Sequence, residues 1–503
     1  MGVPVGNAPA RSAAGGRRSA ERWPLLLVAG LTAVALAVRL TGLGQSIFGD
    51  EFLLLTRVDD RSLGGMLREV HDTESTPPFH FLLAWVGTKL AADPVSGIRL
   101  PSVLLGTATV AVTYLVGLRS VGRNAGLVGA AIVALSPFAI FYGTEGRAYA
   151  TLAFLVALSM LGLVRAVDTG RRPWWVLWAV SACLVLYTHY TGIYVLIAQA
   201  AWAFAAYPRS RRALVAAGGA AALAYLPWLP SFFVQSDDNA SNRIDSFAPL
   251  SVQSYFRDVL KFLDGHPFIP LRELPGRLAL AVFCAAVLAA GVASVARLVR
   301  ERSAREGEER LRMVLLVAAV ALATPAGLLL YSAVAKSIVL PRNMSASLPG
   351  AALIMGWALT TAGRRPAAVA TAAAMIALCA GTVQVLDKSN QRPPFEQAAE
   401  YIDARGRSGD GVIDFFYNPA SKASGRELVD NLEGSYGLFR AGEDDDGAWR
   451  RAEANGSRVF LVVPQIGPLR GVPRRSGPGR RFPLRAYRIF DGWIPLGVFE
   501  YTR

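Results

Sequence analysis

The stretch that decides the fold is PLLLVAGLTAVALAVRLTG, residues 24–42, which is followed by LGQSIFGDE at 43–51. A helix needs roughly 20 mostly apolar residues to cross about 30 Å of hydrocarbon, and this run supplies them. It is too long for the apolar part of a cleaved signal peptide and lacks a small-residue cleavage site, so we expect it to stay in the protein. Further runs of the same kind lie at residues 102–118, 126–142, 149–164, 174–189, 191–207, 213–230, 278–296, 313–335, 343–361 and 367–386. The sequence therefore predicts a polytopic all-α membrane protein with about 11 transmembrane helices.

The composition excludes several other classes of protein. Of the 503 residues, 53% are hydrophobic and 18% are charged, against roughly 25% charged in an average soluble domain. So much apolar content excludes a disordered chain. The three cysteines each lie inside an apolar run, which excludes a disulfide scaffold. The net charge of +15 comes from arginines in short clusters between apolar runs, a pattern that does not fit a nucleic-acid partner.

Arginine clusters give the orientation of the spans, because short cytoplasmic loops are enriched in Lys and Arg. The clusters fall at every second connection between spans only if the apolar segment 78–92 does not cross the membrane. That segment has about 15 residues, which is short for a span. We therefore expect a re-entrant or interfacial helix there. The predicted parts, in a plasma membrane, are a disordered cytoplasmic N-terminus (1–23), a transmembrane catalytic domain (24–386) with outer loops at 43–100 and 231–276, and an extracytoplasmic C-terminal domain (387–503).

The C-terminal segment has the pattern of a small α/β domain. Pro393 and Pro394 mark a boundary, and a helix is expected directly after them, from residue 395 to 405. Residues 411–417 and 458–464 have the apolar content of buried strands, and residues 485–501 have the pattern of a closing strand pair.

Ionisable side chains concentrate at the outer ends of the spans and in the outer loops. Apart from Arg39, at the outer end of the first run, no Asp, Glu, Lys or Arg lies inside the predicted spans. Transporters hold charged groups at mid-membrane, so a transporter or lipid flippase is the weaker alternative, and a non-catalytic scaffold is a second one. The pattern favours a reaction at the outer membrane surface.

Each candidate site residue also has a purely structural interpretation. Asp50 and Glu51 are either a helix N-terminus favoured by the helix dipole or a general base. Asp72, Glu74 and His80 surround Pro77-Pro78 and either start a helix or contact a substrate. Arg147, beside Glu145 and Tyr149, and Arg342 either extend to the interface or bind a phosphate. His189 lies in an outer turn between two tyrosines.

In order along the chain, these motifs resemble those of a known family. They are Asp50-Glu51, Thr76-Pro-Pro-Phe-His80, Arg99-Leu-Pro-Ser, Glu145-Gly-Arg-Ala-Tyr149, Tyr187-Thr-His-Tyr-Thr-Gly and Pro341-Arg342. The set, over residues 24–350, is similar to the GT-C membrane glycosyltransferases of the protein O-mannosyltransferase and aminoarabinose-transferase type. Two positions differ from many relatives: Thr76 stands where those have His or Lys, and Phe79-His80 stands where those have Tyr.

The resemblance implies a GT-C fold and transfer of a sugar, mannose-like or arabinose-like, from a polyprenyl-phosphate carrier to an acceptor hydroxyl, with inversion. It implies Asp50 as the catalytic base with Glu51 beside it, and Arg147 and Arg342 on the carrier phosphate. It leaves a set of substrate contacts: Asp72, Glu74, His80, Glu145, Tyr149 and His189. The acceptor is a glycan, a lipoglycan or a protein. A phosphate leaves as a stable anion, so the scheme requires no general acid and no cofactor, and it leaves a divalent metal open.

Overall fold

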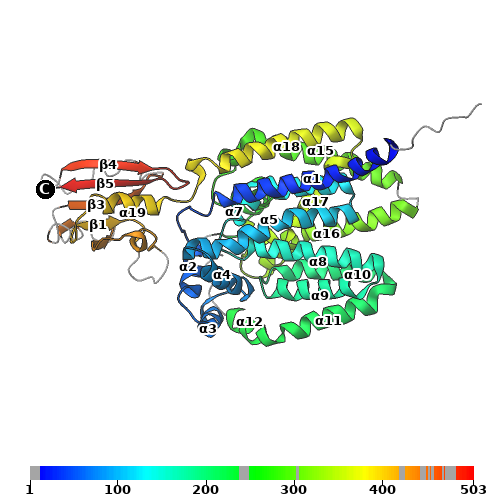
Figure 1. The fold of residues 1–503 in the computed structure, drawn as a ribbon, viewed down its shortest axis with the longest axis horizontal. Helices are drawn as coiled ribbons and strands as arrows, with labels where there is room; N and C mark the ends of the chain where they lie inside the picture. Colours follow the sequence, from blue (N-terminus) through cyan, green and yellow to red (C-terminus); the bar gives the residue numbers. More distant parts are fainter. Residues whose placement is uncertain are drawn as a thin grey trace, which may run out of the picture.

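The computed structural model describes residues 12–236, 248–301, 305–417, 425–441, 449–450, 454, 458–466, 470 and 483–502, with the side chains of residues 12–22 and 305–306 left out. It has two parts. A bundle of long helices makes up the larger part, and a small sheet domain lies beyond one end of the bundle (Figure 1). This arrangement confirms the predicted fold class, an all-α membrane bundle with a small α/β domain.

Each predicted apolar run lies on helical residues, but the run 126–142 is divided at Ser136 and the run 343–361 begins in a 3-10 turn. Among the described residues, seven helical stretches are long and apolar enough to cross a membrane, and shorter apolar helices accompany them. The bundle helices are α1 (Ser12–Leu40), α5 (Pro94–Ser120), α6 (Arg123–Leu135), α7 (Pro137–Tyr142), α8 (Tyr149–Thr169), α9 (Arg172–Leu186), α10 (Gly192–Ala206), α11 (Arg211–Tyr225), α12 (Leu229–Ser236), α15 (Arg277–Glu301), α16 (Arg305–Val334), α17 (Leu348–Thr361) and α18 (Arg364–Val385).

The first helix begins earlier than predicted. It starts at Ser12, in the segment expected to be disordered, because residues 12–22 are rich in Ala and Arg, which favour the helix. Residues 1–11 of that predicted N-terminus lie outside the described residues.

Small residues allow the bundle helices to approach closely. A Cβ on Gly117 would lie 2.4 Å from the Cα of Gly126, so α5 and α6 pack backbone to backbone. A Cβ on Gly356 would lie 2.4 Å from the carbonyl oxygen of Ala125, so α17 packs equally closely on α6. Such contacts are typical of membrane helices, which associate through close packing rather than through exclusion of water.

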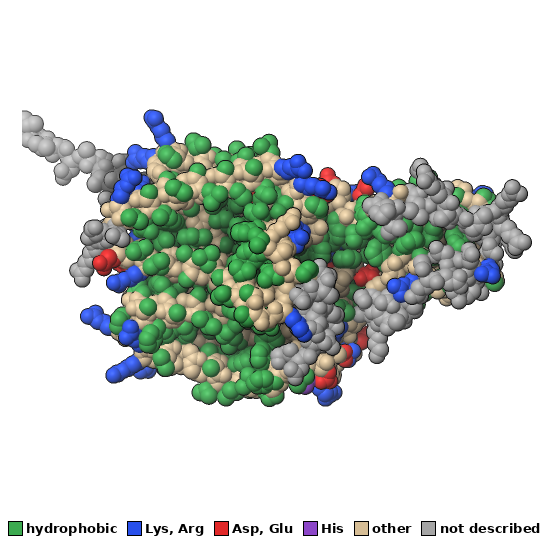
Figure 2. Space-filling model, turned by 180° about the vertical axis from the view of Figure 1, so that it is seen from behind, with side chains coloured by type: hydrophobic (Ala, Val, Ile, Leu, Met, Phe, Trp, Pro, Cys, Tyr) green, Lys and Arg blue, Asp and Glu red, His purple; other side chains and the backbone are tan. Residues whose placement is uncertain are grey.

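The outer flank of the bundle is apolar. Large hydrophobic side chains such as Leu26, Leu288, Val292 and Leu330 are exposed there. Figure 2 shows a broad apolar flank, with mostly Lys and Arg at the end farthest from the sheet domain and Lys, Arg, Asp and Glu together at the end near it. An exposed apolar surface of this extent on long helices defines a multi-pass membrane protein.

The predicted first outer loop is mostly helical. It contains α2 (Asp50–Val58), α3 (Leu63–Thr73) and α4 (Phe79–Leu90), which share an apolar cluster that includes Leu54, Met66 and Phe81. Helix α4 follows Pro78 and has 12 residues, too few to cross a membrane. All three helices lie at the end of the bundle that faces the sheet domain (Figure 1).

The predicted second outer loop contains a helix that was not expected from the sequence, α14 (Val252–Asp264). Ser251 and Ser254 form a capping box at its N-terminus, and the ring of Phe262 packs edge-on against Phe138, with centroids 5.3 Å apart. Helix α14 thereby extends the core beyond α7.

The C-terminal domain has the predicted helix and strands. Helix α19 (Phe395–Asp403) packs on a five-stranded sheet of order β2-β1-β3-β5-β4. The strands are β1 (Gly411–Asp414), β2 (Gly437–Arg440), β3 (Arg458–Pro464), β4 (Leu484–Phe490) and β5 (Leu496–Thr502). β1 pairs in parallel with β2 and β3, and β5 is antiparallel to β3 and β4. Strand β2 was not predicted, because it is a half-exposed edge strand of four residues whose apolar signal is weak.

Candidate active site

Two neighbouring carboxylates begin helix α2 and face different surroundings. Gly49, with φ of +58°, turns the chain into the helix, a backbone conformation that glycine adopts without strain. Asp50 and Glu51 follow in the first turn, where the helix dipole favours negative charge. Because successive helical residues point about 100° apart, one carboxylate is directed into the protein and the other is not.

Glu51 is the carboxylate that is wholly buried. The guanidinium of Arg99 donates two hydrogen bonds to it, at 2.9 and 2.7 Å, and the amide of Gly146 donates a third at 2.8 Å. Arg392 approaches both carboxylate oxygens at 3.3 Å. Burial by itself would raise the pKa of Glu51, but the charges of Arg392 and Arg99 hold it below its ordinary value. Glu51 is therefore a fixed anion whose hydrogen-bonding capacity is filled.

Arg392 connects the C-terminal segment to this anion. It precedes the Pro393-Pro394 boundary, yet its side chain is buried in the bundle end and its guanidinium lies 5.3 Å from the ring centroid of Phe141. Arg99 secures the other side, because it also donates to the carbonyl oxygens of Leu43 and Ser46 in the connection to α2. The pair of arginines thus holds α2 against both α5 and the C-terminal domain.

Asp50 is accessible. Its side chain is 30% exposed, and one oxygen lies 2.8 Å from Nη1 of Arg342, which enters from the 3-10 turn Pro341–Ser347. Burial by itself would raise the pKa of Asp50, but the charges of Arg342, then Arg147 and Arg57, outweigh it and hold the pKa below the ordinary value. Asp50 is an ionised, reachable carboxylate with arginines on several sides.

Arg147 is held in place but keeps a free donor. One guanidinium nitrogen lies 3.7 Å from Glu74, whose other oxygen lies 2.5 Å from Arg57. Phe81 packs under the guanidinium, with its ring centroid 5.8 Å away. The buried Nη1 of Arg147 has no hydrogen-bond partner among the described residues. A buried guanidinium with an unused donor is suited to bind an anion.

Glu145 completes the group as a neutral acid. It is buried in the turn between α7 and α8, and its Oε2 accepts no hydrogen bond from the described residues. Burial, reinforced by the nearby charges of Glu51 and Asp50, raises the pKa of Glu145 to about 8. Near neutral pH this side chain carries a proton, so it can donate a hydrogen bond.

The remaining predicted residues divide between the site and its surroundings. Tyr149 and His189 lie together, with ring centroids 5.8 Å apart, and the charges of Arg147 and Arg342 act on both. His80 is wholly buried and its Nδ1 lies 3.0 Å from the hydroxyl of Thr151. Burial, with the charge of Arg147, lowers the pKa of His80 to about 3, so its ring is neutral. Asp72 stands apart, exposed at the end of α3 and paired with His71 at 2.7 Å.

Sequence reasoning missed three arginines of this group: Arg57, Arg99 and Arg392. Arg99 lay inside a motif that was recognised, but nothing local in the sequence connects it with Glu51. Among the described residues, no group of three or more His, Cys, Asp or Glu side chains is arranged to hold a metal ion.

Known proteins share a segment of this chain and its fold. Residues 75–230, which contain Arg147 and His189, match the family model of dolichyl-phosphate-mannose-protein mannosyltransferase. The chain is also similar to ArnT from Cupriavidus metallidurans in the apo state, with a TM-score of 0.51 and 14% identity over 96% of this chain and 98% of that one. For ArnT bound to undecaprenyl phosphate the TM-score is 0.50, with 14% identity over 95% and 98%. No protein among the curated sequences matches this chain.

At this level of identity the structural likeness establishes the fold alone, which is that of a polytopic membrane protein. The family match covers residues 75–230 and the shared fold covers nearly the whole chain, so the two together show a resemblance to the GT-C membrane glycosyltransferases of the ArnT and mannosyltransferase type. The resemblance predicted from the sequence is confirmed.

Proposed function

We propose that the protein transfers a sugar from a polyprenyl-phosphate carrier to an acceptor hydroxyl at the outer face of the plasma membrane, with inversion. The observation that carries this proposal is the pair formed by Asp50 and Arg342, an accessible carboxylate 2.8 Å from a guanidinium, within the electrostatic reach of Arg147. A base next to two cations is the set of groups that displacement of a phosphate by a hydroxyl requires.

In the proposed reaction Asp50 removes the proton of the acceptor hydroxyl. The hydroxyl oxygen forms a bond to the anomeric carbon while the bond from that carbon to the carrier phosphate breaks, and the electron pair leaves with the phosphate. Arg147 and Arg342 stabilise the departing phosphate, so no general acid is needed. Attack on the face opposite the leaving group inverts the anomeric centre.

Arg342 couples donor binding to the strength of the base. In the free site it neutralises Asp50, which keeps the pKa of that carboxyl low. When a phosphate takes the guanidinium, Asp50 loses part of this stabilisation and its pKa rises, which makes it a stronger base. Asp50 is therefore a stronger base when the donor is bound than when the site is free.

We propose a different role for Glu51 from the one expected. Its oxygens are already occupied by Arg99, Arg392 and Gly146, so it positions α2 rather than taking a proton. Glu74, occupied by Arg57, likewise positions Arg147. Tyr149, His189 and the protonated Glu145 remain substrate contacts in this proposal, whereas His80 is buried against Thr151. Asp72 lies apart from the group and has no role in it.

The membrane itself contributes to donor binding. The apolar flank of the bundle fits an isoprenoid chain, and the similar ArnT structure holds undecaprenyl phosphate. The bundle end farthest from the sheet domain carries mostly Lys and Arg, whereas the end near it carries Lys, Arg, Asp and Glu together (Figure 2). This asymmetry supports a cytoplasmic N-terminus and an extracytoplasmic C-terminal domain. The arginines already supply the charge that a metal would bring, so we propose that transfer needs no divalent metal.

The test is transfer by purified protein in proteoliposomes, with radiolabelled polyprenyl-phosphate hexoses and pentoses as donors. We expect Asp50→Asn to lower the rate by about 10²–10⁴-fold, the contribution of a positioned base. The matched control is Glu69→Gln, which changes a carboxylate of the same outer loop that is also 30% exposed and also paired with an arginine, Arg61, at 3.1 Å. Equal rates for wild type and a folded Asp50→Asn protein would remove Asp50 as the base.

A further inference from the structure

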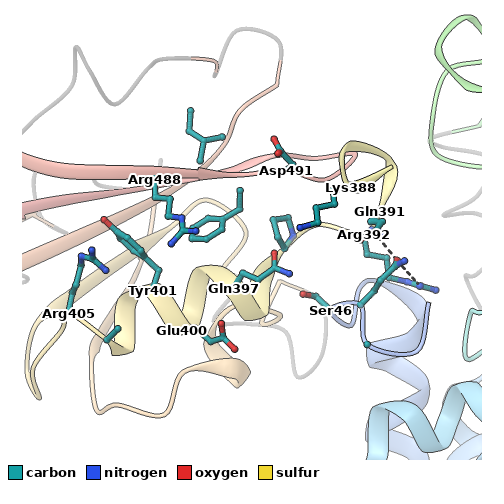
Figure 3. A pocket seen from close by; sticks show the side chains of 16 residues that line it. Ser46, Lys388, Gln391, Arg392, Gln397, Glu400, Tyr401, Arg405, Arg488 and Asp491 are labelled. Carbon is teal, nitrogen blue, oxygen red and sulfur yellow. Dashed lines mark hydrogen bonds between the residues drawn. The ribbon is translucent and has the colours of Figure 1, made fainter. Parts of the chain in front are cut away.

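A groove of about 660 Å³ lies where the C-terminal domain meets the membrane part (Figure 3). One wall is the connection Gly44–Ser46, which leads to Asp50. The opposite wall is one face of α19, which presents Gln397, Glu400 and Tyr401, continued by Ala404 and Arg405 directly after the helix. The connection between the two domains, residues 388–392, and the end of β4 close the sides. Its volume is in the range of ordinary ligand sites.

Charged side chains with free capacity line the groove. Lys388, Arg392, Arg405 and Arg488 supply four cations, against the two carboxylates of Glu400 and Asp491. Arg392 is engaged by Glu51, and Arg405 lies 3.7 Å from Glu500. Lys388, Arg488, Glu400 and Asp491 form no ion pair within the described part of the chain, and each is exposed. Figure 3 shows Arg488 and Lys388 on opposite sides of Gln397.

Flat side chains form the floor at one end. The guanidinium of Arg405 lies 4.1 Å from the ring centroid of Tyr401, and that ring packs edge-on against Phe490 with centroids 5.9 Å apart. Arg488 lies 5.1 Å from the Phe490 centroid. The ring of Tyr401 is itself buried, so the exposed guanidiniums of Arg405 and Arg488 are the flat surfaces on which a sugar ring can stack. Gln391 and Gln397 add amides that both donate and accept.

We propose that this groove binds an anionic glycan, which serves as the acceptor of the transfer reaction. Sugar hydroxyls both donate and accept hydrogen bonds, so they match a lining that mixes amides, carboxylates and cations. Glu51 is shared between Arg392 and Arg99, and Glu500 between Arg405 and Arg458, so a positive surplus remains beside the groove. This surplus favours a sugar that carries a carboxylate or another anionic group. An apolar peptide or an acyl chain fits poorly, since Ile489, Pro394 and Ala404 are the few aliphatic side chains of the lining.

The groove adjoins the proposed active site. Arg392 belongs to both, since it lines the groove and contacts Glu51. Ser46, four residues before Asp50, also lines the groove. Its hydroxyl accepts a hydrogen bond from the backbone amide of Glu396 at 3.2 Å. A glycan in the groove therefore lies next to the segment that carries the base. The acceptor role rests on the proposed function, whereas glycan binding does not.

The experiment measures binding of an oligogalacturonate to full-length protein in detergent micelles, without any donor lipid. Its methyl ester serves as the uncharged twin, and inorganic phosphate as a simple anion. We expect the methyl ester to bind about tenfold more weakly or worse, the loss of one charge-assisted hydrogen bond. Lys388→Gln combined with Arg488→Gln should weaken binding of the acid by a similar factor. Arg485→Gln, on the same strand but outside the groove, should not.

Three outcomes would overturn the proposal: equal binding of acid and ester, no effect of the double variant, or displacement of the oligogalacturonate by equimolar phosphate. Binding without any sugar transfer would refute the proposed function and leave the glycan site standing. Transfer without binding would do the reverse.

Discussion

Replacing Glu51 and Asp50 one at a time separates the stability of the fold from its chemistry. Glu51→Gln keeps the size of the side chain but removes the anion that Arg99 and Arg392 share, and these two guanidiniums are almost completely buried. Removing one partner of a buried ion pair costs about 3–5 kcal/mol, because the remaining charge is left uncompensated. Asp50→Asn breaks a partly exposed pair with Arg342, for which about 0–1 kcal/mol is typical.

The free energy of unfolding is measured by titrating SDS into mixed micelles and following tryptophan fluorescence, to which ten tryptophans contribute. Glu51→Gln should lower it by about 3 kcal/mol more than Asp50→Asn does. Arg392→Met in the Glu51→Gln background removes one uncompensated cation and should recover part of the loss. If both single variants were equally stable, or if the second substitution made the protein still less stable, Glu51 would not be the shared anion we describe.

Further predictions concern pH and the domain junction. Arg342→Gln removes the cation next to Asp50, so the pKa of Asp50 should rise and the acid limb of the pH–rate profile should move to higher pH; an unmoved limb would contradict the pairing. The pKa of Glu145 rises from 4.5 to about 8 on folding, so the native state holds a proton that the unfolded state loses. Stability should therefore fall as pH rises from about 4.5 to about 8, and Glu145→Gln should abolish that slope in unfolding midpoints across pH. Arg392→Gln removes a partner of buried Glu51 and should lower the midpoint of unfolding in SDS. Arg407→Gln, at an exposed position of the same domain, should leave that midpoint unchanged.

The elements of the fold were predictable where the signal is local. A membrane span is recognised from the length of one apolar run of roughly 20 residues. Strand β3 was predicted over its full extent, 458–464, because a strand that is buried along nearly its whole length reads as a continuous apolar run. Helix α14 was missed, although Ser251 as a cap and apolar residues at helical spacing around Val259 and Phe262 carry the signal. The apolar spans drew attention away from an amphipathic segment between them.

The candidate site was predictable only in part, because its pairings join distant residues. Asp50, Arg147 and Arg342 were found through motifs, and the structure brings them together. The partners of Glu51 lie 48 and 341 residues away, at Arg99 and Arg392, and no spacing rule connects such positions. The two carboxylates are adjacent in sequence, so only the direction in which each side chain points distinguishes an accessible base from a buried anion.

The charge balance of the whole group bears on the proposed reaction. Five arginines, Arg57, Arg99, Arg147, Arg342 and Arg392, face three ionised carboxylates, Asp50, Glu51 and Glu74, because Glu145 holds its proton. The surplus is five minus three, or two positive charges. A sugar linked through a phosphodiester carries one negative charge, and the phosphate that departs carries up to two, so the site matches the charge that develops as the bond breaks better than the charge of the bound donor. Interactions that strengthen toward the transition state are those that raise kcat.

Ionisation of Glu145 above a pH of about 8 halves this positive surplus, from two charges to one. We therefore expect transfer to slow above that pH through a lower kcat rather than a higher KM. If the fall in kcat above that pH persisted unchanged in Glu145→Gln, another group would be responsible for it.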